Sequence, residues 1–288
     1  RAADVFRPLY EKSGGGDGFV SVEVSPEIFD DTAATIDAAQ GLHKGIDRPN
    51  LMVKIPATDA GIPAIEAMTA AGHSINITLI FPLTRYRQVI DAYMSGLEAL
   101  LVGGGDPTRV HSVASFFVSR VDTEIDRRLA GIDTDAADAL QGSAAVAQAR
   151  LAYQMFQTLF TNPRWRRLAD AGGRVQRPLW ASTSTKDPDY PDTKYVGELI
   201  GPDTVTTLTD STIDAFEHHG TVARTIDQAT PHPVDTINRL QQVGIDLDEV
   251  GSVLETKGIE RFRADQQSAI DTLAAKVGEL TATRPSQT

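Results

Sequence analysis

The sequence predicts an α/β fold built from parallel βα units. Six short apolar runs, rich in β-branched and aromatic residues, alternate with stretches that have the periodicity of amphipathic helices. The starts of successive runs lie 32, 24, 35, 68 and 26 residues apart. Each interval has room for a crossover helix between two parallel strands. Six such units fit an open doubly wound sheet, whereas a closed (β/α)8 barrel needs two more, which would lie before the first residue.

The predicted strands follow one another along the whole chain. They are Phe19–Val24, Leu51–Pro56, Ile75–Phe81, Val110–Phe117, Pro178–Thr183 and Thr204–Leu208. With no linker or low-complexity segment between them, residues 1–288 are predicted to form a single domain.

Capping residues and apolar periodicity indicate helices between the strands. Ser25-Pro26-Glu27 has the pattern of a helix start, and so does Thr209-Asp210-Ser211. The longest intervals hold extra helices before the fifth strand and at the C-terminal end. The predicted helical stretches are Arg1–Glu11, Thr84–Leu101, Ala144–Phe160, Arg164–Asp170, Thr212–His218 and Lys257–Leu280.

Composition excludes several classes of protein. Charged residues make up 23% and hydrophobic residues 41% of the chain, which is ordinary globular usage and argues against disorder. A net charge of −12 disfavours a general binder of nucleic acid or of anionic membranes, and no run is apolar enough to span a membrane. There is no cysteine, and the six histidines lack the spacing of metal ligands.

The chain starts at Arg1, inside an amphipathic pattern and without a signal peptide. This start predicts an N-terminally truncated chain whose first helix has lost its beginning.

Polar side chains share one face of neighbouring predicted strands. Because strand side chains alternate, Val20, Val22 and Val24 lie on one face of the first run and Glu23 lies on the other. The same division of the next three runs places four more polar groups on the face of Glu23. They are Lys54, Asn76, Thr78 and Ser115. In a barrel this face points into the interior, and its later residues lie near the catalytic mouth.

A lysine on an apolar strand can be interpreted in two ways. Lys54 could lie on an edge strand or form a buried ion pair with Glu23, which would be a structural role. Alternatively, a lysine withdrawn from water can be a free amine near neutral pH and attack a carbonyl to form a Schiff base. The four further polar groups on this face favour the second interpretation, a lysine that forms a Schiff base.

Four segments resemble motifs of the transaldolase family, in the family's order and spacing. The lysine motif is Met52-Val53-Lys54-Ile55-Pro56-Ala57-Thr58. The others are Val20-Ser21-Val22-Glu23-Val24, Ile75-Asn76-Ile77-Thr78-Leu79-Ile80-Phe81 and Ser112-Val113-Ala114-Ser115-Phe116-Phe117-Val118-Ser119-Arg120-Val121-Asp122. The resemblance covers essentially the whole chain, and Gln176–Thr183 resembles the actinobacterial type.

The resemblance implies a class I aldolase barrel in which the six strands hold positions three to eight. Lys54 would form a Schiff base with a ketose phosphate, Glu23 would act through a bound water in a proton relay aided by Thr78, and Asn76 would bind substrate hydroxyls. The remaining substrate-binding residues would be Ser115, Phe117, Arg120, Ser182 and Lys186. The implied reaction moves a dihydroxyacetone unit from fructose 6-phosphate or sedoheptulose 7-phosphate to an aldose phosphate, in the non-oxidative pentose phosphate pathway of the cytoplasm. It needs no metal or organic cofactor, and the enzyme could be a homo-oligomer.

Two departures from the family pattern keep alternatives open. The family's catalytic Asp on its first strand and its Thr-Asn-Pro motif would both lie before Arg1. Lys186 stands near the place where many members have a phosphate-binding Arg, and as a point charge it lacks that residue's bidentate geometry. The alternatives are a Schiff-base aldolase that releases free dihydroxyacetone and a catalytically silent phosphosugar-binding fragment. The related short aldolases use a Tyr in the role that the resemblance implies for Glu23, which counts against the first alternative.

Overall fold

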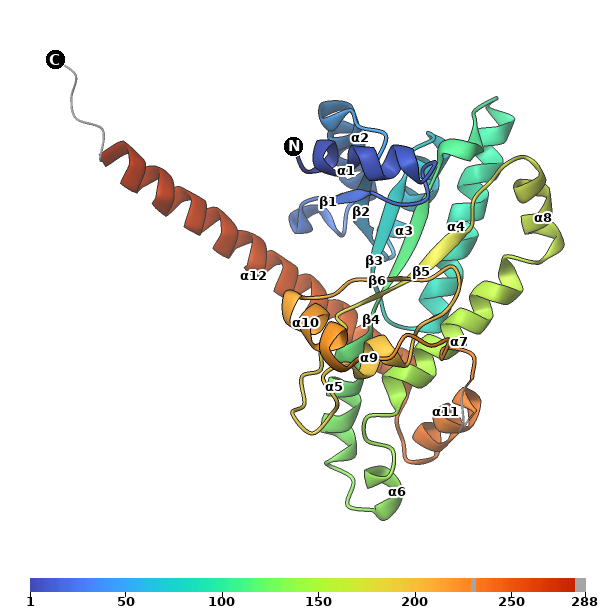
Figure 1. Ribbon diagram of the computed structural model, residues 1–288, viewed down its shortest axis with the longest axis vertical. Coiled ribbons are helices and arrows are strands. Elements are labelled where there is room, and N and C mark those ends of the chain that lie inside the picture. Colours follow the sequence, from blue (N-terminus) through green and yellow to red (C-terminus); the bar gives the residue numbers. More distant parts are fainter. Residues whose placement is uncertain (229–231, 283–288) are drawn as a thin grey trace.

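The computed structural model describes residues 1–228 and 232–282 and contains six parallel strands in one sheet. The strands are paired in the order in which they occur in the sequence, so each crossover returns the chain to the neighbouring position. They are β1 (Val20–Glu23), β2 (Leu51–Pro56), β3 (Ile75–Ile80), β4 (Ser112–Phe117), β5 (Gln176–Ala181) and β6 (Val205–Thr206). The sheet curls into a half-barrel (Figure 1), which confirms the parallel βα prediction.

The described residues contain two strands fewer than a closed eight-stranded barrel. The half-barrel is consistent with the predicted barrel class. That the strands hold positions three to eight stays a prediction.

Helices precede, connect and follow the strands. The helices before β4 are α1 (Ala2–Lys12), α2 (Thr32–Ile46), α3 (Gly61–Ala70) and α4 (Leu83–Val102), with the short 3-10 helices η1 (Pro26–Ile28) and η2 (Pro107–Arg109). Those between β4 and β5 are α5 (Val118–Leu129), α6 (Asp135–Asp138), α7 (Ala144–Leu159) and α8 (Pro163–Asp170). The rest are α9 (Lys194–Gly197), α10 (Asp210–His219), α11 (Pro233–Gln242) and α12 (Leu247–Ala282). The predicted extra helices before the fifth strand and at the C-terminal end are confirmed.

The predicted helix start at Ser25-Pro26-Glu27 is confirmed, but the helix that begins there is a single short turn. The Ser25 hydroxyl accepts a hydrogen bond from the Glu27 backbone amide, but the turn that it caps is only η1. The long helix α2 begins at Thr32, where the Asp31 carboxylate accepts from the amide of Ala34. Both segments have a good capping residue, and only the second is followed by a stretch long enough for a stable helix.

The core has one large and one small part. Aliphatic side chains on the outer face of the strands, such as Val53, Ile55 and Ile77, are fully buried among the surrounding helices. On the inner face, Met52, Val113 and Leu179 form a separate apolar cluster. Met52 precedes Lys54 and Val113 precedes Ser115 in their strands, so this cluster supplies apolar surface next to the polar residues of the inner face.

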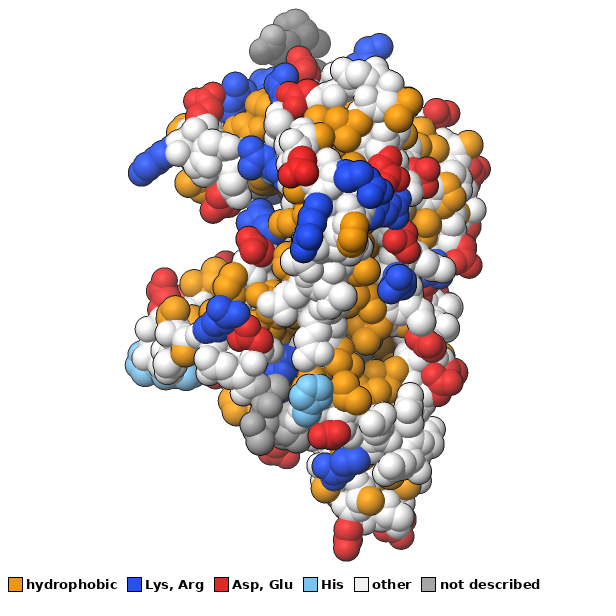
Figure 2. Space-filling model, turned by 90° about the vertical axis from the view of Figure 1, so that its right-hand side faces the viewer, with side chains coloured by type: hydrophobic (Ala, Val, Ile, Leu, Met, Phe, Trp, Pro, Cys, Tyr) orange, Lys and Arg blue, Asp and Glu red, His pale blue; other side chains and the backbone are white. Residues whose placement is uncertain are grey.

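The surface has mixed charge on the face shown in Figure 2, where Lys and Arg are interspersed with Asp and Glu. Within the described part of the chain, no helix combines the length and the apolar character needed to cross a membrane.

Candidate active site

Lys54 and Glu23 lie opposite each other near the carboxyl ends of two neighbouring strands. The register of β1 and β2 pairs their Cα positions, and Lys54 Nζ lies 3.3 Å from Glu23 Oε2. Both side chains are about one-fifth exposed. Lys54 is not on an edge strand of the sheet, because its strand, β2, is paired with β1 on one side and with β3 on the other. The structure therefore excludes an edge position for Lys54 and places it in an ion pair with Glu23.

The carboxyl of Glu23 is not fully satisfied. Its Oε1 atom is buried and has no hydrogen-bond partner among the residues that the structure describes. Burial raises the pKa of Glu23, and the neighbouring Lys54 offsets part of that increase. A carboxyl with a raised pKa and a free oxygen atom next to an amine is suited to exchange protons.

Asn76 links three strands on the inner face. Its position in β3 pairs with Lys54 in β2. Its amide donates to Ser21 Oγ at 3.0 Å, and its carbonyl oxygen accepts from Ser115 Oγ at 2.8 Å. These bonds fix the orientation of the amide, so Asn76 and Ser115 present an ordered polar surface beside the lysine.

Thr78 is fully buried two residues after Asn76, and its Oγ1 has no partner in the structure. The pairing of β3 with β4 shifts between Ile77 and Ile80, and Leu79 has a φ of 56°. A left-handed backbone is rare for a bulky residue and costs on the order of 1–3 kcal/mol. Strained backbone beside an unpartnered hydroxyl is typical of a functional site.

Arg120 and Phe117 form the other side of the site, at the start of α5. The Arg120 guanidinium lies 4.8 Å from the centre of the Phe117 ring. Burial lowers the pKa of Arg120, and the nearby charge of Arg261 adds to this. No hydrogen bond or ion pair joins Arg120 to any residue that the structure describes. An arginine stacked on a ring with its donors unused is suited to bind an anion.

Ser182 lies at the same helix terminus. Its hydroxyl is 2.8 Å from the hydroxyl of Ser119, and its carbonyl oxygen accepts from the Ser119 amide at 3.0 Å. Ser182 also has a left-handed backbone, with a φ of 55°. No side chain caps α5. The positive end of the helix dipole therefore adds to the charge of Arg120.

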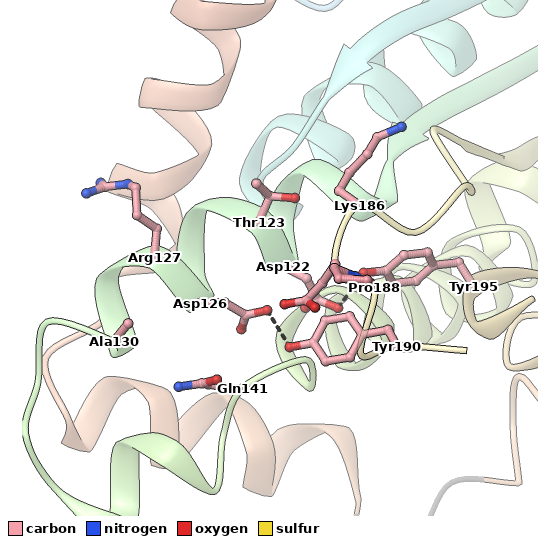
Figure 3. A pocket seen from close by; sticks show the side chains of 11 residues that line it. Asp122, Thr123, Asp126, Arg127, Ala130, Gln141, Lys186, Pro188, Tyr190 and Tyr195 are labelled. Atoms are coloured by element: carbon pink, nitrogen blue, oxygen red, sulfur yellow. Dashed lines mark hydrogen bonds between the residues drawn. The ribbon is translucent and has the colours of Figure 1, made fainter. Parts of the chain in front are cut away.

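Lys186 lies apart from the other predicted residues. Its ammonium donates to Ser184 Oγ at 2.8 Å. It is at the rim of a separate cavity of about 410 Å³, whose walls include Asp122, Asp126 and Tyr190. Figure 3 shows the Lys186 ammonium pointing away from these two carboxylates. No described contact connects it with Arg120, and its role in binding phosphate stays a prediction.

Sequence reasoning missed one residue of this site, Phe262 on α12. Lys54 Nζ lies 5.2 Å from the centre of the Phe262 ring, which also approaches the rings of Phe29 and Phe117, each at 6.3 Å. The helical pattern of residues 257–280 predicts the helix, but it has no feature that shows which strand ends the helix crosses.

The described residues contain no cluster of three or more His, Asp or Glu side chains that could hold a metal ion. The site instead has one carboxyl beside Lys54 and one guanidinium, that of Arg120, which is connected to the lysine through the rings of Phe117 and Phe262. Such an arrangement suits acid–base and nucleophilic chemistry on an anionic substrate.

Comparison with known proteins agrees with this geometry. The family profile described as "Transaldolase/Fructose-6-phosphate aldolase" matches residues 1–273. A transaldolase of Parafrankia sp. (strain EAN1pec) is 50% identical over 280 residues, which are 96% of this chain and 75% of that protein. Transaldolases of Thermobifida fusca and Mycolicibacterium smegmatis are 48% and 49% identical, over 97% and 98% of this chain and 76% of each relative. The chain belongs to the transaldolase/fructose-6-phosphate aldolase family.

Proposed function

We propose that this chain is a transaldolase that transfers a dihydroxyacetone unit between sugar phosphates through a Schiff base on Lys54. The observation that carries the proposal is the position of the Lys54 amine, 3.3 Å from the Glu23 carboxyl at the carboxyl ends of parallel strands. Relatives about 50% identical over almost the whole chain carry the name transaldolase.

The first step is attack of the uncharged Lys54 amine on the ketone carbon of the donor. The C–N bond forms, the carbonyl oxygen takes up a proton, and this oxygen then leaves as water while the C=N bond forms. Glu23 accepts and returns the proton, through a bound water molecule, with the Thr78 hydroxyl in the same relay. Its raised pKa and unpartnered oxygen support this role.

Carbon–carbon cleavage follows: the hydroxyl on the carbon beyond the broken bond gives its proton to the relay of Glu23, Thr78 and bound water, its C=O bond forms, and an aldose phosphate leaves a three-carbon enamine on Lys54. The C=N bond accepts the electron pair of the broken C–C bond, which is why the Schiff base is needed. The enamine attacks the aldehyde of an acceptor sugar phosphate, and hydrolysis of the new Schiff base frees the product. Asn76 would bind the hydroxyls of the transferred unit, and its hydrogen bonds with Ser21 and Ser115, which fix its amide, support this role.

The substrate phosphate would bind at the start of α5. Arg120 supplies charge, the uncapped helix terminus supplies backbone amides, and Ser115 and Ser182 contribute hydroxyls. Phe117 holds the guanidinium by stacking and lines the pocket. Lys186 is proposed as a further phosphate ligand only if its ammonium turns away from Ser184.

The proposal also includes expectations about the complete fold and the cellular location of the protein. They are a closed eight-stranded barrel with β1–β6 at positions three to eight and a cytoplasmic location, whereas the resemblance leaves assembly as a homo-oligomer open. They are supported by the family resemblance, and the curled parallel sheet agrees with the first.

The alternative functions differ in what happens to the three-carbon unit. A simple aldolase releases free dihydroxyacetone, and a silent phosphosugar-binding protein forms no bond to substrate. The test follows consumption of fructose 6-phosphate with and without erythrose 4-phosphate. A transaldolase consumes the donor rapidly only with the acceptor present.

Two variants control this test. Lys54→Ala should abolish turnover, and Lys44→Ala, which removes an exposed lysine of α2, should not. Equal consumption without the acceptor would indicate the aldolase. Binding without consumption would indicate the silent protein.

A further inference from the structure

We propose that Phe262 is a positioning residue that holds Lys54 and shields the lysine-bound dihydroxyacetone unit from water, so that the unit is transferred instead of released. The inference rests on the proposed function, because it concerns what happens to the intermediate formed on Lys54. It assigns the C-terminal helix α12 a part in deciding between transfer and hydrolysis.

The Phe262 ring closes one side of the space around the lysine. It lies 5.2 Å from Lys54 Nζ, and its neighbours Phe29 and Phe117 extend the apolar surface on either side. The polar neighbours of the amine are on the strands, where Glu23 and Asn76 stand beside it in the register of the sheet. Lys54 is therefore surrounded by groups of two kinds, polar groups on the sheet and an aromatic ring from α12.

Two glycines let α12 approach the sheet closely. A Cβ atom on Gly258 would lie 2.9 Å from Leu79 Cδ2, and one on Gly251 would lie 2.8 Å from Pro82 Cδ. A larger residue at Gly251 would collide with the rigid ring of Pro82, just before α4, and one at Gly258 would force the Leu79 side chain at the end of β3 to shift. Gly258 is one helical turn before Phe262. The close approach of the helix at Gly258 therefore determines how far the Phe262 ring lies from the ends of the strands.

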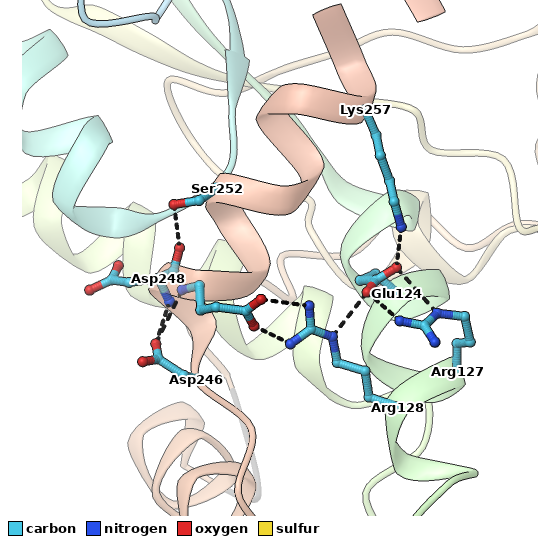
Figure 4. Close-up of polar contacts among 8 residues, drawn as sticks. Glu124, Arg127, Arg128, Asp246, Asp248, Ser252 and Lys257 are labelled. Carbon is cyan, nitrogen blue, oxygen red and sulfur yellow. Dashed lines mark hydrogen bonds and ion pairs between the residues drawn. The ribbon is translucent and has the colours of Figure 1, made fainter. Parts of the chain in front are cut away.

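Polar contacts fix α12 on both sides of the ring. Before it, Lys257 Nζ lies 2.8 Å from Glu124 Oε2, and Arg128 joins Glu124 to Glu249 near the start of the helix (Figure 4). These contacts anchor α12 to α5, the helix that begins with the proposed phosphate site.

After the ring, α12 is held by the segment that follows β1. Arg263 pairs with Asp30 at 3.0 Å, and its Nε donates to the Pro26 carbonyl oxygen at 3.3 Å. The Ser25 hydroxyl donates to Gln266 at 3.2 Å. The far end of α12 projects away from the rest of the molecule (Figure 1). The anchored part of the helix is therefore the part that carries Phe262.

The chemical consequence concerns a side reaction of the enamine. If the enamine carbon takes up a proton, the intermediate becomes a Schiff base of dihydroxyacetone. Water then adds to the C=N carbon, the C–N bond breaks, the water oxygen becomes the ketone oxygen, and the amine returns to Lys54. An apolar ring over the amine keeps water from this side of the enamine and so disfavours its protonation, while water on the Glu23 side can still hydrolyse the product Schiff base and an acceptor sugar can enter from the phosphate site.

The test measures how often the three-carbon unit is released for each transfer. With fructose 6-phosphate as donor and erythrose 4-phosphate as acceptor, free dihydroxyacetone is counted with glycerol dehydrogenase and NADH, and the aldose product in a parallel assay. In Phe262→Ala and in Phe262→Gln, which keeps much of the volume but is polar, the ratio of release to transfer should rise by about 10-fold or more. In Phe262→Leu, which stays apolar, it should stay within about twofold of the parent value.

Leu273→Ala, on the exposed projecting part of the same helix, is the matched control and should leave the ratio unchanged. A purely structural role of Phe262 would lower transfer and release together, so an unchanged ratio in the Ala and Gln variants would overturn the inference. An equal rise in the Leu273 control would also overturn it.

Two further results separate the possible failures. If Phe262→Ala does not fold, as judged by circular dichroism, the comparison of Gln with Leu decides. If borohydride traps no adduct on Lys54 of the parent protein, the proposed function itself fails. If the parent protein gives the Lys54 adduct but the ratio of release to transfer is unchanged in the Phe262 variants, only the role of Phe262 is refuted and the proposed function stands.

Discussion

Lys54 Nζ and Glu23 Oε2 lie 3.3 Å apart on neighbouring strands, and the second oxygen of Glu23 is buried without a hydrogen-bond partner in the described part of the chain. An ion pair that served only stability would be expected to satisfy both carboxylate oxygens, because a buried unpartnered oxygen costs free energy. The unpartnered oxygen therefore points to a role of Glu23 beyond stability.

The first prediction concerns Glu23. In Glu23→Gln the side chain keeps its size but cannot accept a proton, so kcat should fall about 10²- to 10⁴-fold. Since burial raises the pKa of Glu23, the acid limb of kcat/KM in the parent should lie above pH 4.5, with activity rising as the carboxyl ionises. This acid limb should be absent in Glu23→Gln, and pH–rate profiles of both proteins check this.

Glu27→Gln, which changes an exposed carboxyl of η1, is the control. An unchanged pH–rate profile in Glu23→Gln would rule out the proton relay through Glu23.

The second prediction concerns the substrate phosphate. Arg120→Ala removes the guanidinium that no described residue engages in an ion pair or a hydrogen bond. Loss of charge-assisted hydrogen bonds should lower kcat/KM for fructose 6-phosphate by about 10- to 100-fold, mainly through KM. Turnover of fructose, which has no phosphate, should change little. Arg166→Ala on the exposed side of α8 provides the comparison, and a similar loss with both donors would show that Arg120 does not act on the phosphate.

The third prediction concerns the anchoring of α12. Glu124 accepts from Arg127, Arg128 and Lys257 at 2.7–2.9 Å, and these partners, Arg127 first, lower its pKa to about 2. Glu124→Gln leaves the three cations without their shared anion and should lower the free energy of unfolding by about 2 kcal/mol near neutral pH. Urea unfolding measures this, with Glu260→Gln on the exposed face of α12 as the control.

The pH dependence of this cluster has a definite sign. A carboxyl whose pKa is lowered by folding stabilises the protein above its unfolded pKa, near 4.5, and the contribution is lost as the pH falls toward 2. The difference in stability between parent and Glu124→Gln should therefore shrink across this range. A constant difference would show that the carboxylate charge is not responsible.

The fourth prediction concerns two stacked histidines far from the site. The rings of His43 and His73 lie 4.1 Å apart, and burial, followed by repulsion from His73, lowers the pKa of His43 to about 4. Burial also lowers the pKa of His73. Because the folded state binds fewer protons than the unfolded state, stability should fall as the pH decreases from 6.5 to about 4. In His43→Phe, which keeps the stacked ring but cannot be protonated, Tm should decrease less between pH 7 and pH 5. An equal decrease in both proteins would contradict the assignment.

The strands and their inner faces were predictable because both follow from local patterns. Alternation within each run assigns Glu23, Lys54, Asn76, Thr78 and Ser115 to one face, and the parallel register brings the first three side by side. The order of the strands in the sheet is the same as their order in the sequence, so no long-range information was needed to predict it. The helix start at Ser25 was predicted correctly, but its short length was not, because a capping residue marks the beginning of a helix and not its end.

Contacts between distant segments could not be read from the sequence. Phe262 is 208 residues after Lys54, and its place over the amine depends on how α12 docks through Gly251 and Gly258. The position of Lys186 likewise depends on the path of the loop after β5, which directs it to a cavity beside α5. Local periodicity identifies such elements, but tertiary packing determines their neighbours.

The most direct test of the account is borohydride reduction in the presence of fructose 6-phosphate, followed by intact mass measurement and peptide mapping. The account predicts one adduct of a dihydroxyacetone unit or the intact ketose phosphate, confined to Lys54 and absent from a folded Lys54→Ala variant. A folded parent protein that gives no adduct, or an adduct on another lysine, would contradict the assignment of Lys54 as the Schiff-base residue.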